Sequence, residues 1–271
     1  MKKILFLVFS FISSVTVFAQ DSLAVDSVSA GNSIAHTVIS TKNVTKGEAD
    51  SAYIRNDFAS AIQLYEALLN KGESAEVYYN LGNAYYKADN IAKAILNYER
   101  ALLLNPGDND IRFNLEMARA KTVDKVNPTS EMFFVTWFNS IKNLMGADLW
   151  AKCAITSFIL FIITLALFIF AKQIVLKKVG FALSILFLIA VIFTNIFASK
   201  QKDSLENRTE AIIISPSVTV KSTPNESGTD LFILHEGHKV NIKDNSMKAW
   251  KEIRLEDGNV GWVPTDVIEI I

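Results

Sequence analysis

The side chains able to do chemistry in this sequence are few, and their spacing argues against a reactive centre. His235 and His238 have the spacing of a metal-binding pair, but no aspartate, glutamate or cysteine is placed as an obvious third ligand. Asp108 and Asp110 are not followed by the glycine and glutamate of a calcium loop. Cys153 is the single cysteine, so neither an intramolecular disulfide nor a cysteine metal cluster is expected. It lies far in sequence from any histidine, so it is not expected to be a nucleophile.

The sequence also contains no phosphate-binding glycine loop, no HExxH motif and no GxSxG motif. We therefore expect no catalytic residue, no metal, no cofactor and no enzymatic activity. The net charge of −1 and the lack of a strongly basic stretch argue against a nucleic-acid partner. Half of the 271 residues are hydrophobic, and the excess falls in three blocks, which indicates targeting and membrane segments.

The first apolar block begins the chain. Two lysines precede the apolar run 4–18, and small residues stand at the −3 and −1 positions before Gln20. Residues 1–19 are therefore predicted to be a cleavable secretory signal peptide, with a retained N-terminal anchor as the alternative. In both cases the residues that follow are exported. Residues 20–47 are rich in Ser, Val, Thr and Asn without a helical period, which predicts a disordered tether.

The second and third blocks, residues 153–171 and 179–198, contain no charged residue. Each has about 20 residues, and at ~1.5 Å per residue that length matches the ~30 Å hydrocarbon core of a bilayer. They predict two transmembrane helices joined by the loop 172–178. An exported N-terminus puts this loop in the cytoplasm, where its three lysines agree with the positive-inside tendency, and returns the C-terminus to the outer side.

The segments that flank the two predicted spans are expected to be connectors. Residues 127–152 mix apolar and polar residues irregularly. They are interpreted either as a linker helix packed on the soluble domain or as an interfacial helix with Trp137 and Trp150 at headgroup level, and the two tryptophans favour the second. Residues 199–208 are predicted to be a linker.

Residues 48–126 are predicted to be helical, and they repeat. Segment 56–66 matches segment 89–99, 33 residues later, and a period in this range marks a repeat array. The central copy resembles the tetratricopeptide repeat, whose eight signature positions hold Tyr78, Leu81, Gly82, Tyr85, Ala94, Tyr98, Ala101 and Pro106. The prediction is an all-α solenoid of one weak repeat, one clear repeat and a terminal helix.

The residue types at these positions have physical reasons. Gly82 is small where the two helices of the repeat cross, and Tyr98 fills the space beside that crossing. Pro106 ends the second helix, and Asp108 can cap the next one.

The resemblance to tetratricopeptide repeats implies that the concave groove binds segments of partner proteins through first-helix residues. An alternative is that Tyr86 and Met117 pack between repeats. The groove positions carried over from the family are Tyr79, Asn80, Asn83, Tyr86, Phe113, Asn114 and Met117.

The chain after Arg208 changes to short β-rich segments separated by turns, which imply a small closed all-β barrel over residues 209–271. The order resembles a bacterial SH3 domain, through segments 218–224, 236–240, 250–253 and 257–263. Trp250 and Trp262 are expected in the core or half-core. Relatives of such domains bind cell-wall peptides or proteins, and some only pack structurally.

The order of signal, tetratricopeptide repeats, two-span hairpin and SH3-like module resembles the BatE-type proteins of the Bat aerotolerance family. This resemblance covers nearly the whole mature chain. It implies a multi-domain protein of the bacterial inner membrane with both soluble modules in the periplasm. It also implies partners, namely other Bat membrane proteins with von Willebrand A-type domains and a MoxR-type ATPase system on the cytoplasmic side.

Two functions are expected from this layout. The first is a membrane-anchored scaffold that assembles an envelope complex connected with aerotolerance or stress. The alternative is a peptidoglycan-associated sensor that binds cell-wall peptides through its SH3-like module.

Overall fold

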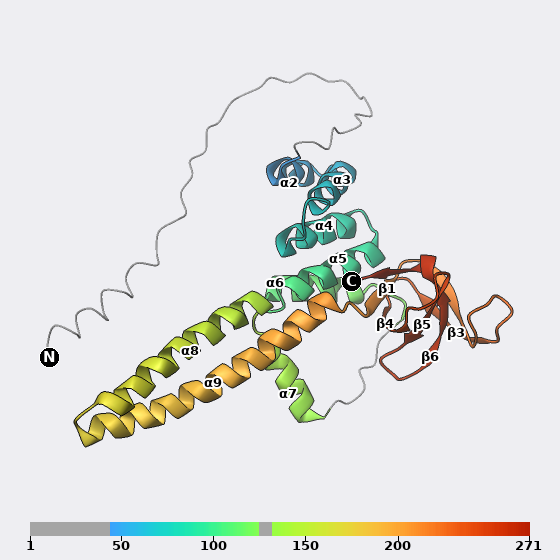
Figure 1. Ribbon diagram of the computed structural model, residues 1–271. Helices are drawn as coiled ribbons and strands as arrows, with labels where there is room; N and C mark the ends of the chain where they lie inside the picture. The colour runs from blue at the N-terminus through green and yellow to red at the C-terminus, as the bar shows by residue number, and fades with distance from the viewer. Residues whose placement is uncertain (1–43, 125–131) are drawn as a thin grey trace, which may run out of the picture. The chain divides into compact units, whose positions relative to one another are not determined.

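A computed structural model describes residues 44–124 and 132–271. The predicted signal peptide, most of the predicted tether and residues 127–131 of the predicted linker lie outside the described residues. Figure 1 shows the rest as an array of helices, a long two-helix hairpin and a β-sheet.

Consecutive helices of the repeat region pack against one another (Figure 1). The helices are α2 (Lys46–Ile54), α3 (Phe58–Leu69), α4 (Ala75–Lys87), α5 (Ile91–Leu104) and α6 (Asn109–Arg119). The last two residues of the predicted tether 20–47 are therefore helical. A capping box explains this start, because Thr45 and Glu48 each accept a hydrogen bond from the other's backbone N–H.

The same kind of turn joins α2 to α3 and α4 to α5. This repeated turn is the structural counterpart of the 33-residue period. Asn56 and Asp89 both have a φ of 61°, a left-handed conformation that Asn and Asp tolerate better than other side chains. After each, the next backbone N–H bonds to the carbonyl five residues earlier, Asp57 to Ala52 and Asn90 to Tyr85. This is the Schellman arrangement that ends a helix, and it turns the chain directly into the N-cap of the following one.

Gly82 and Tyr98 form the closest contact between α4 and α5. A Cβ atom placed on Gly82 would lie 2.7 Å from two ring carbons of Tyr98, and the Tyr98 side chain is almost fully buried. The roles predicted for both residues are confirmed by this geometry. Helix α5 ends at Leu104, two residues before Pro106, and Asp108 caps α6 through two backbone N–H groups, also as predicted.

Gly82→Ala should lower the free energy of unfolding by about 1–3 kcal/mol, because the rigid ring of Tyr98 cannot yield to the added methyl group. Chemical denaturation of the purified chain, followed by circular dichroism, measures the change. Gly47→Ala is the matched control, since Gly47 is also helical but has no atom near its Cβ position, and it should be neutral or stabilising. Equal effects of the two substitutions would contradict the packing argument.

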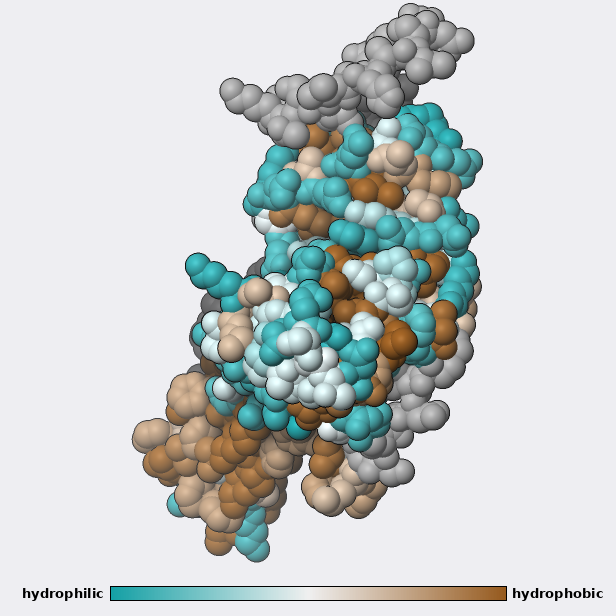
Figure 2. Space-filling model, turned by 90° about the vertical axis from the view of Figure 1, so that its right-hand side faces the viewer, coloured by the Kyte–Doolittle hydropathy of each residue, from teal (hydrophilic) through white to brown (hydrophobic). Residues whose placement is uncertain are grey.

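The hairpin consists of α8 (Ala147–Phe170) and α9 (Ile174–Glu206), which run side by side (Figure 1). Both helices are long and apolar enough to cross a membrane, and most of their apolar side chains are exposed, as the brown surface in Figure 2 shows. They meet through small residues. A Cβ atom on Gly180 would lie 2.8 Å from the backbone nitrogen of Phe168, and Ser184 and Thr164 are buried beside this contact.

Two predicted connectors differ from the structure. The loop predicted over 172–178 is shorter, because α9 already begins at Ile174 and only residues 171–173 separate the helices. The linker predicted over 199–208 is mostly the last part of α9. Hydropathy marks where a helix is apolar and not where it ends, and Lys, Gln and Glu at these borders are good helix formers.

Residues 132–152 form a separate short helix, α7 (Phe133–Lys142), and the first turns of α8. The two tryptophans behave differently. Trp137 is 62% exposed, whereas Trp150 is buried, with its indole N–H donating to the Lys142 carbonyl at 2.9 Å and its ring 4.8 Å from that of Phe197. Trp150 therefore packs against α9 within the hairpin, whereas Trp137 is open to the surroundings.

The C-terminal module is one antiparallel sheet with strand order β3-β2-β6-β5-β4-β1-β7 across the described residues. The strands are β1 (Glu210–Ile213), β2 (Ser217–Lys221), β3 (Asp230–His235), β4 (Lys239–Asp244), β5 (Trp250–Arg254), β6 (Val260–Pro264) and β7 (Ile268–Ile270). Trp250 and Trp262 are half-buried.

The prediction of a closed barrel is wrong, because the edge strands β3 and β7 do not pair with each other. Strand β7 has three residues and pairs with β1, and β2 meets β6 at one paired position, Lys221 with Trp262. Leu234 of β3 and Ile268 of β7 still enter the same apolar core. The sheet therefore curls around its core without joining its edges.

The sheet docks on α5 through buried charges. The Glu99 side chain, on a residue 7% exposed, pairs with Arg119 and with the Lys239 ammonium at 3.0 Å, and Lys239 also pairs with Glu210 at 2.8 Å. Burial opposes the charge of Glu99, but Lys239 and Arg119 outweigh it and lower the pKa of the carboxyl. Docking thus depends on an ionised Glu99.

A second docking contact joins the two histidines to Asp124, at the end of the repeat region. Its carboxylate accepts the backbone N–H of His235 at 2.7 Å and lies 2.8 Å from that residue's Nδ1, and it is 3.7 Å from Nδ1 of His238. Sequence reasoning missed Asp124, which is 111 residues from His235. Gly237, between the two histidines in the sequence, has a φ of +83°. A Cβ atom placed on it would lie 2.7 Å from the Thr122 side chain and 3.0 Å from that of Ile95.

Acidification should weaken this docking. The pKa values of Glu99 and Asp124 are lowered from 4.5 and 3.8, so their contribution is complete above those values and is lost as the pH falls through the lowered ones. His238 acts in the same direction. Burial lowers its pKa from 6.5 against the attraction of Asp124, Glu256 and Asp257, so the undocked form takes up a proton more readily.

The melting temperature of the purified chain should therefore fall between pH 7 and pH 4. Glu99→Gln should flatten the part of this dependence below about pH 4.5 and lower the plateau, because Lys239 and Arg119 lose their shared partner. Glu76→Gln changes an exposed carboxyl and should leave the slope as it is. A pH profile that Glu99→Gln does not alter would refute the role of this cluster.

Candidate protein-binding groove

A hollow of about 280 Å³ opens on the face made by the first helices of the repeats. Its walls come from α2, α3 and α4, and its lining residues are Asp50, Tyr53, Ile54, Tyr65, Asn80 and Asn83. Two of the seven predicted groove residues, Asn80 and Asn83, are thus in the lining.

Asp50 organises the floor of this hollow. Its carboxylate accepts hydrogen bonds from the Tyr65 hydroxyl at 2.6 Å, the Lys46 ammonium at 2.8 Å and the Asn80 amide at 3.4 Å. Burial opposes its ionisation, but the hydrogen bonds from Lys46 and Tyr65 outweigh burial and lower the pKa of Asp50. The groove therefore presents a fixed carboxylate with both oxygens oriented by neighbours.

The internal repeat of the sequence indicates Asp50 and Tyr53 as groove residues, although the family pattern alone does not. The 33-residue period that relates segments 56–66 and 89–99 also places Asp50 at the position of Asn83, and Tyr53 at that of Tyr86. The first repeat matches the motif weakly, so its groove residues were not predicted. Tyr65 corresponds to the signature residue Tyr98, which was not predicted to line the groove, and Ile54 corresponds to Lys87, which was not predicted either.

Asparagine side chains continue the groove from α4 to α6. The Asn114 amide donates to the Tyr79 hydroxyl at 3.0 Å and to Oδ1 of Asn83 at 2.9 Å, and the buried Tyr98 hydroxyl donates to the same Oδ1 at 2.7 Å. Tyr79, Asn83 and Asn114 are thus brought together as one hydrogen-bonded group. Their polar atoms are partly used in holding α4, α5 and α6 in register.

The remaining predicted residues lie at the α6 end. Phe113 and Met117 are 64% and 44% exposed, so neither is enclosed between helices. Tyr86 is half-buried, and the Lys121 ammonium lies 4.2 Å from the centre of its ring. The groove surface therefore combines an apolar exposed edge, an amide centre and the carboxylate of Asp50.

Among the described residues, no group of three or more His, Cys, Asp or Glu side chains is arranged to hold a metal ion. The groove offers hydrogen bonds, one carboxylate and apolar contact area, which is the chemistry of peptide recognition.

Comparison with known proteins identifies one segment. Residues 75–108, which form α4, α5 and the turn to α6, match the family model of the tetratricopeptide repeat. No curated protein matches the chain. The chain therefore contains a tetratricopeptide repeat, and the match covers the two helices whose crossing Gly82 and Tyr98 fill.

Asn83→Ala combined with Tyr79→Ala should cost about 1–2 kcal/mol of stability, because the Tyr98 hydroxyl and the Asn114 amide lose their partners. Urea denaturation of the purified chain measures this. Lys87→Ala, at the exposed end of the same helix, is the control and should change stability little. No loss in the double variant would show that the amide group does not hold the three helices together.

Proposed function

We propose that this protein is a membrane-anchored scaffold, without catalytic activity, whose tetratricopeptide groove captures a segment of a partner protein. The observation that carries the proposal is the pairing of the matched repeat with a groove whose apolar edge, Phe113 and Met117, is exposed. Repeats of this family point generally to protein partners.

The anchorage is supported by α8 and α9, which are long and apolar enough to cross a membrane. We place them in the bacterial inner membrane, with the groove and the C-terminal module in the periplasm. The resemblance to BatE-type proteins supplies this placement and the partners, which are membrane proteins with von Willebrand A-type domains and a MoxR-type ATPase system. The proposed physiological role of this complex is in aerotolerance or another envelope stress response.

We infer that the C-terminal sheet is an SH3-like module that has remained open at its edges. Its docked position on α5 supports a structural role, since the Lys239–Glu99 pair that holds it is mostly buried. One observation favours the alternative of a cell-wall sensor. Leu231 and Ile233 on the edge strand β3 are 47% and 58% exposed, and such an edge suits a peptide ligand. The sensor predicts retention of the full chain on peptidoglycan, and the scaffold does not.

Phe113→Ala combined with Met117→Ala should weaken partner capture with little loss of stability, because both side chains are exposed. A photo-crosslinking residue at Tyr86 in native membranes, followed by mass spectrometry, measures capture. The expected adduct is a membrane protein with a von Willebrand A-type domain.

Val123→Ala is the matched control for this experiment, since it removes an exposed apolar side chain that is outside the predicted groove residues. It should leave the adduct unchanged. An adduct that persists equally in the double variant would sink the groove as the binding site.

A further inference from the structure

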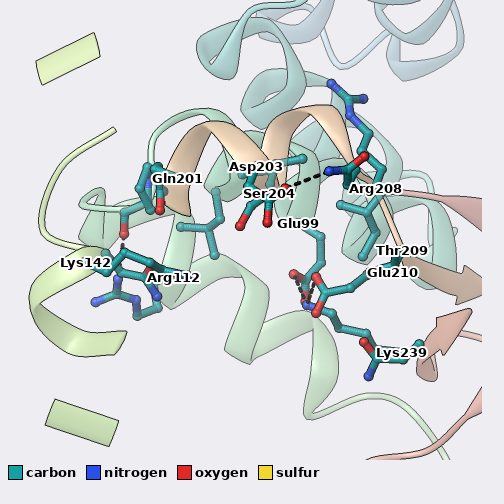
Figure 3. A pocket seen from close by; sticks show the side chains of 17 residues that line it. Glu99, Arg112, Lys142, Gln201, Asp203, Ser204, Arg208, Thr209, Glu210 and Lys239 are labelled. Carbon is teal, nitrogen blue, oxygen red and sulfur yellow. Dashed lines mark hydrogen bonds and ion pairs between the residues drawn. The ribbon is translucent and has the colours of Figure 1, made fainter. Parts of the chain in front are cut away.

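A polar cavity of about 470 Å³ lies where the repeat helices, the last turns of α9 and the sheet meet (Figure 3). Gln201, Asp203 and Ser204 of α9, together with Asn207 just after its end, form part of its wall. The predicted span ends at Ala198, three residues earlier, which is about 5 Å along the helix. If α9 crosses the membrane as proposed above, on which this inference rests, the cavity lies at the depth of the lipid headgroups.

The charges at one end of the cavity are already neutralised within the protein. Lys239 pairs with Glu99 and Glu210, and these three side chains lie together in Figure 3. Arg208 binds both carboxylate oxygens of Glu73. Lys239 and Arg208 are therefore already paired with carboxylates of the protein and are not free to bind an anionic ligand.

The other end differs, because Lys142 and Arg112 lie there together beside Gln201 (Figure 3). Neither cation has a carboxylate partner among the described residues. The Arg112 guanidinium donates one hydrogen bond, to the Pro106 carbonyl at 2.7 Å, and most of its donors have no acceptor among the described residues. Two adjacent cations with open donors favour an anion with several oxygens.

A buried acceptor without a donor lies beside these cations. Gln201 is 4% exposed, and its Oε1 has no hydrogen-bond donor in the part of the chain that the structure describes. A buried acceptor in this state carries a free-energy cost that a donor from a ligand would remove.

We propose that this end of the cavity binds a phospholipid headgroup that carries a phosphodiester and a primary amine, as in phosphatidylethanolamine. Lys142 and Arg112 hold the phosphate oxygens, and Gln201 Oε1 accepts a hydrogen bond from the ammonium group. The ligand supplies the donor that Gln201 lacks and an anion for the two open cations. The soluble source of the same chemistry is inorganic phosphate, which matches only the cationic half of the site.

The test uses the delipidated full chain in detergent, titrated with phosphatidylethanolamine or phosphatidylcholine and followed by native mass spectrometry. Phosphatidylethanolamine should bind about tenfold more tightly, because the trimethylated amine of phosphatidylcholine donates no N–H bond to Gln201. Lys142→Ala should weaken its binding by about tenfold. Gln201→Leu should remove the preference between the two lipids.

Lys200→Ala is the matched control, since Lys200 is exposed one residue before Gln201 and does not line the cavity. It should leave binding unchanged. Equal affinity for both lipids, equal losses in the Lys142 and Lys200 variants, or saturable binding of inorganic phosphate without a lipid preference would each overturn the proposal.

Membrane insertion is measured separately, by flotation of the full chain with vesicles. A chain that floats but shows no lipid preference overturns the headgroup site alone. A chain that does not float overturns the proposed anchorage and the headgroup site together.

Discussion

The carboxylate of Glu99 lies almost out of reach of solvent, and a charge in such a place is stable only when it is paired. Its two partners come from different parts of the chain, Arg119 from the end of α6 and Lys239 from the start of β4. The pairing therefore requires that α5, α6 and the sheet be assembled around one point. Removing either partner would leave the buried carboxylate with one cation in place of two, so the interaction favours the one docked arrangement in which both cations reach it.

Other contacts of the molecule follow from this arrangement. With the sheet held on α5, Glu269 of β7 reaches Lys93 and Arg100, each at 3.2 Å. The end of α9 is fixed from the other side, because Arg208 is tied to Glu73 in the loop before α4. The polar cavity lies between these tied elements. Long charged side chains satisfy their hydrogen bonds there instead of packing densely, which leaves space that an apolar interface would fill.

Local patterns predicted local structure well in this chain. Gly82, Tyr98 and Asp108 could be assigned from the repeat motif, because their roles depend on neighbours within one or two helices. Asp50 escaped prediction since the first repeat departs from the motif, although the 33-residue offset pointed to it. Asp124 meeting His235 could not be predicted, since no local pattern relates residues that far apart. The failure to close the barrel has the same origin, because closure requires the edge strands β3 and β7 to pair, and no local pattern relates those two strands.

The position of the sheet allows it to dock on the repeat helices and still leave the candidate groove uncovered. The groove residues lie on α2, α4 and α6 with Tyr65 of α3, whereas the sheet contacts α5 and the segment that follows α6. In a repeat array the first and second helices present opposite faces, so docking on α5 leaves the face with Asp50 and Asn83 uncovered. The buried ion cluster of Glu99, Arg119 and Lys239 holds α5 and α6 against the sheet. The first strand of that sheet, β1, directly follows the end of α9. A segment bound in the groove as proposed would therefore be held in a defined orientation to the hairpin, which a flexible tether between modules would not provide.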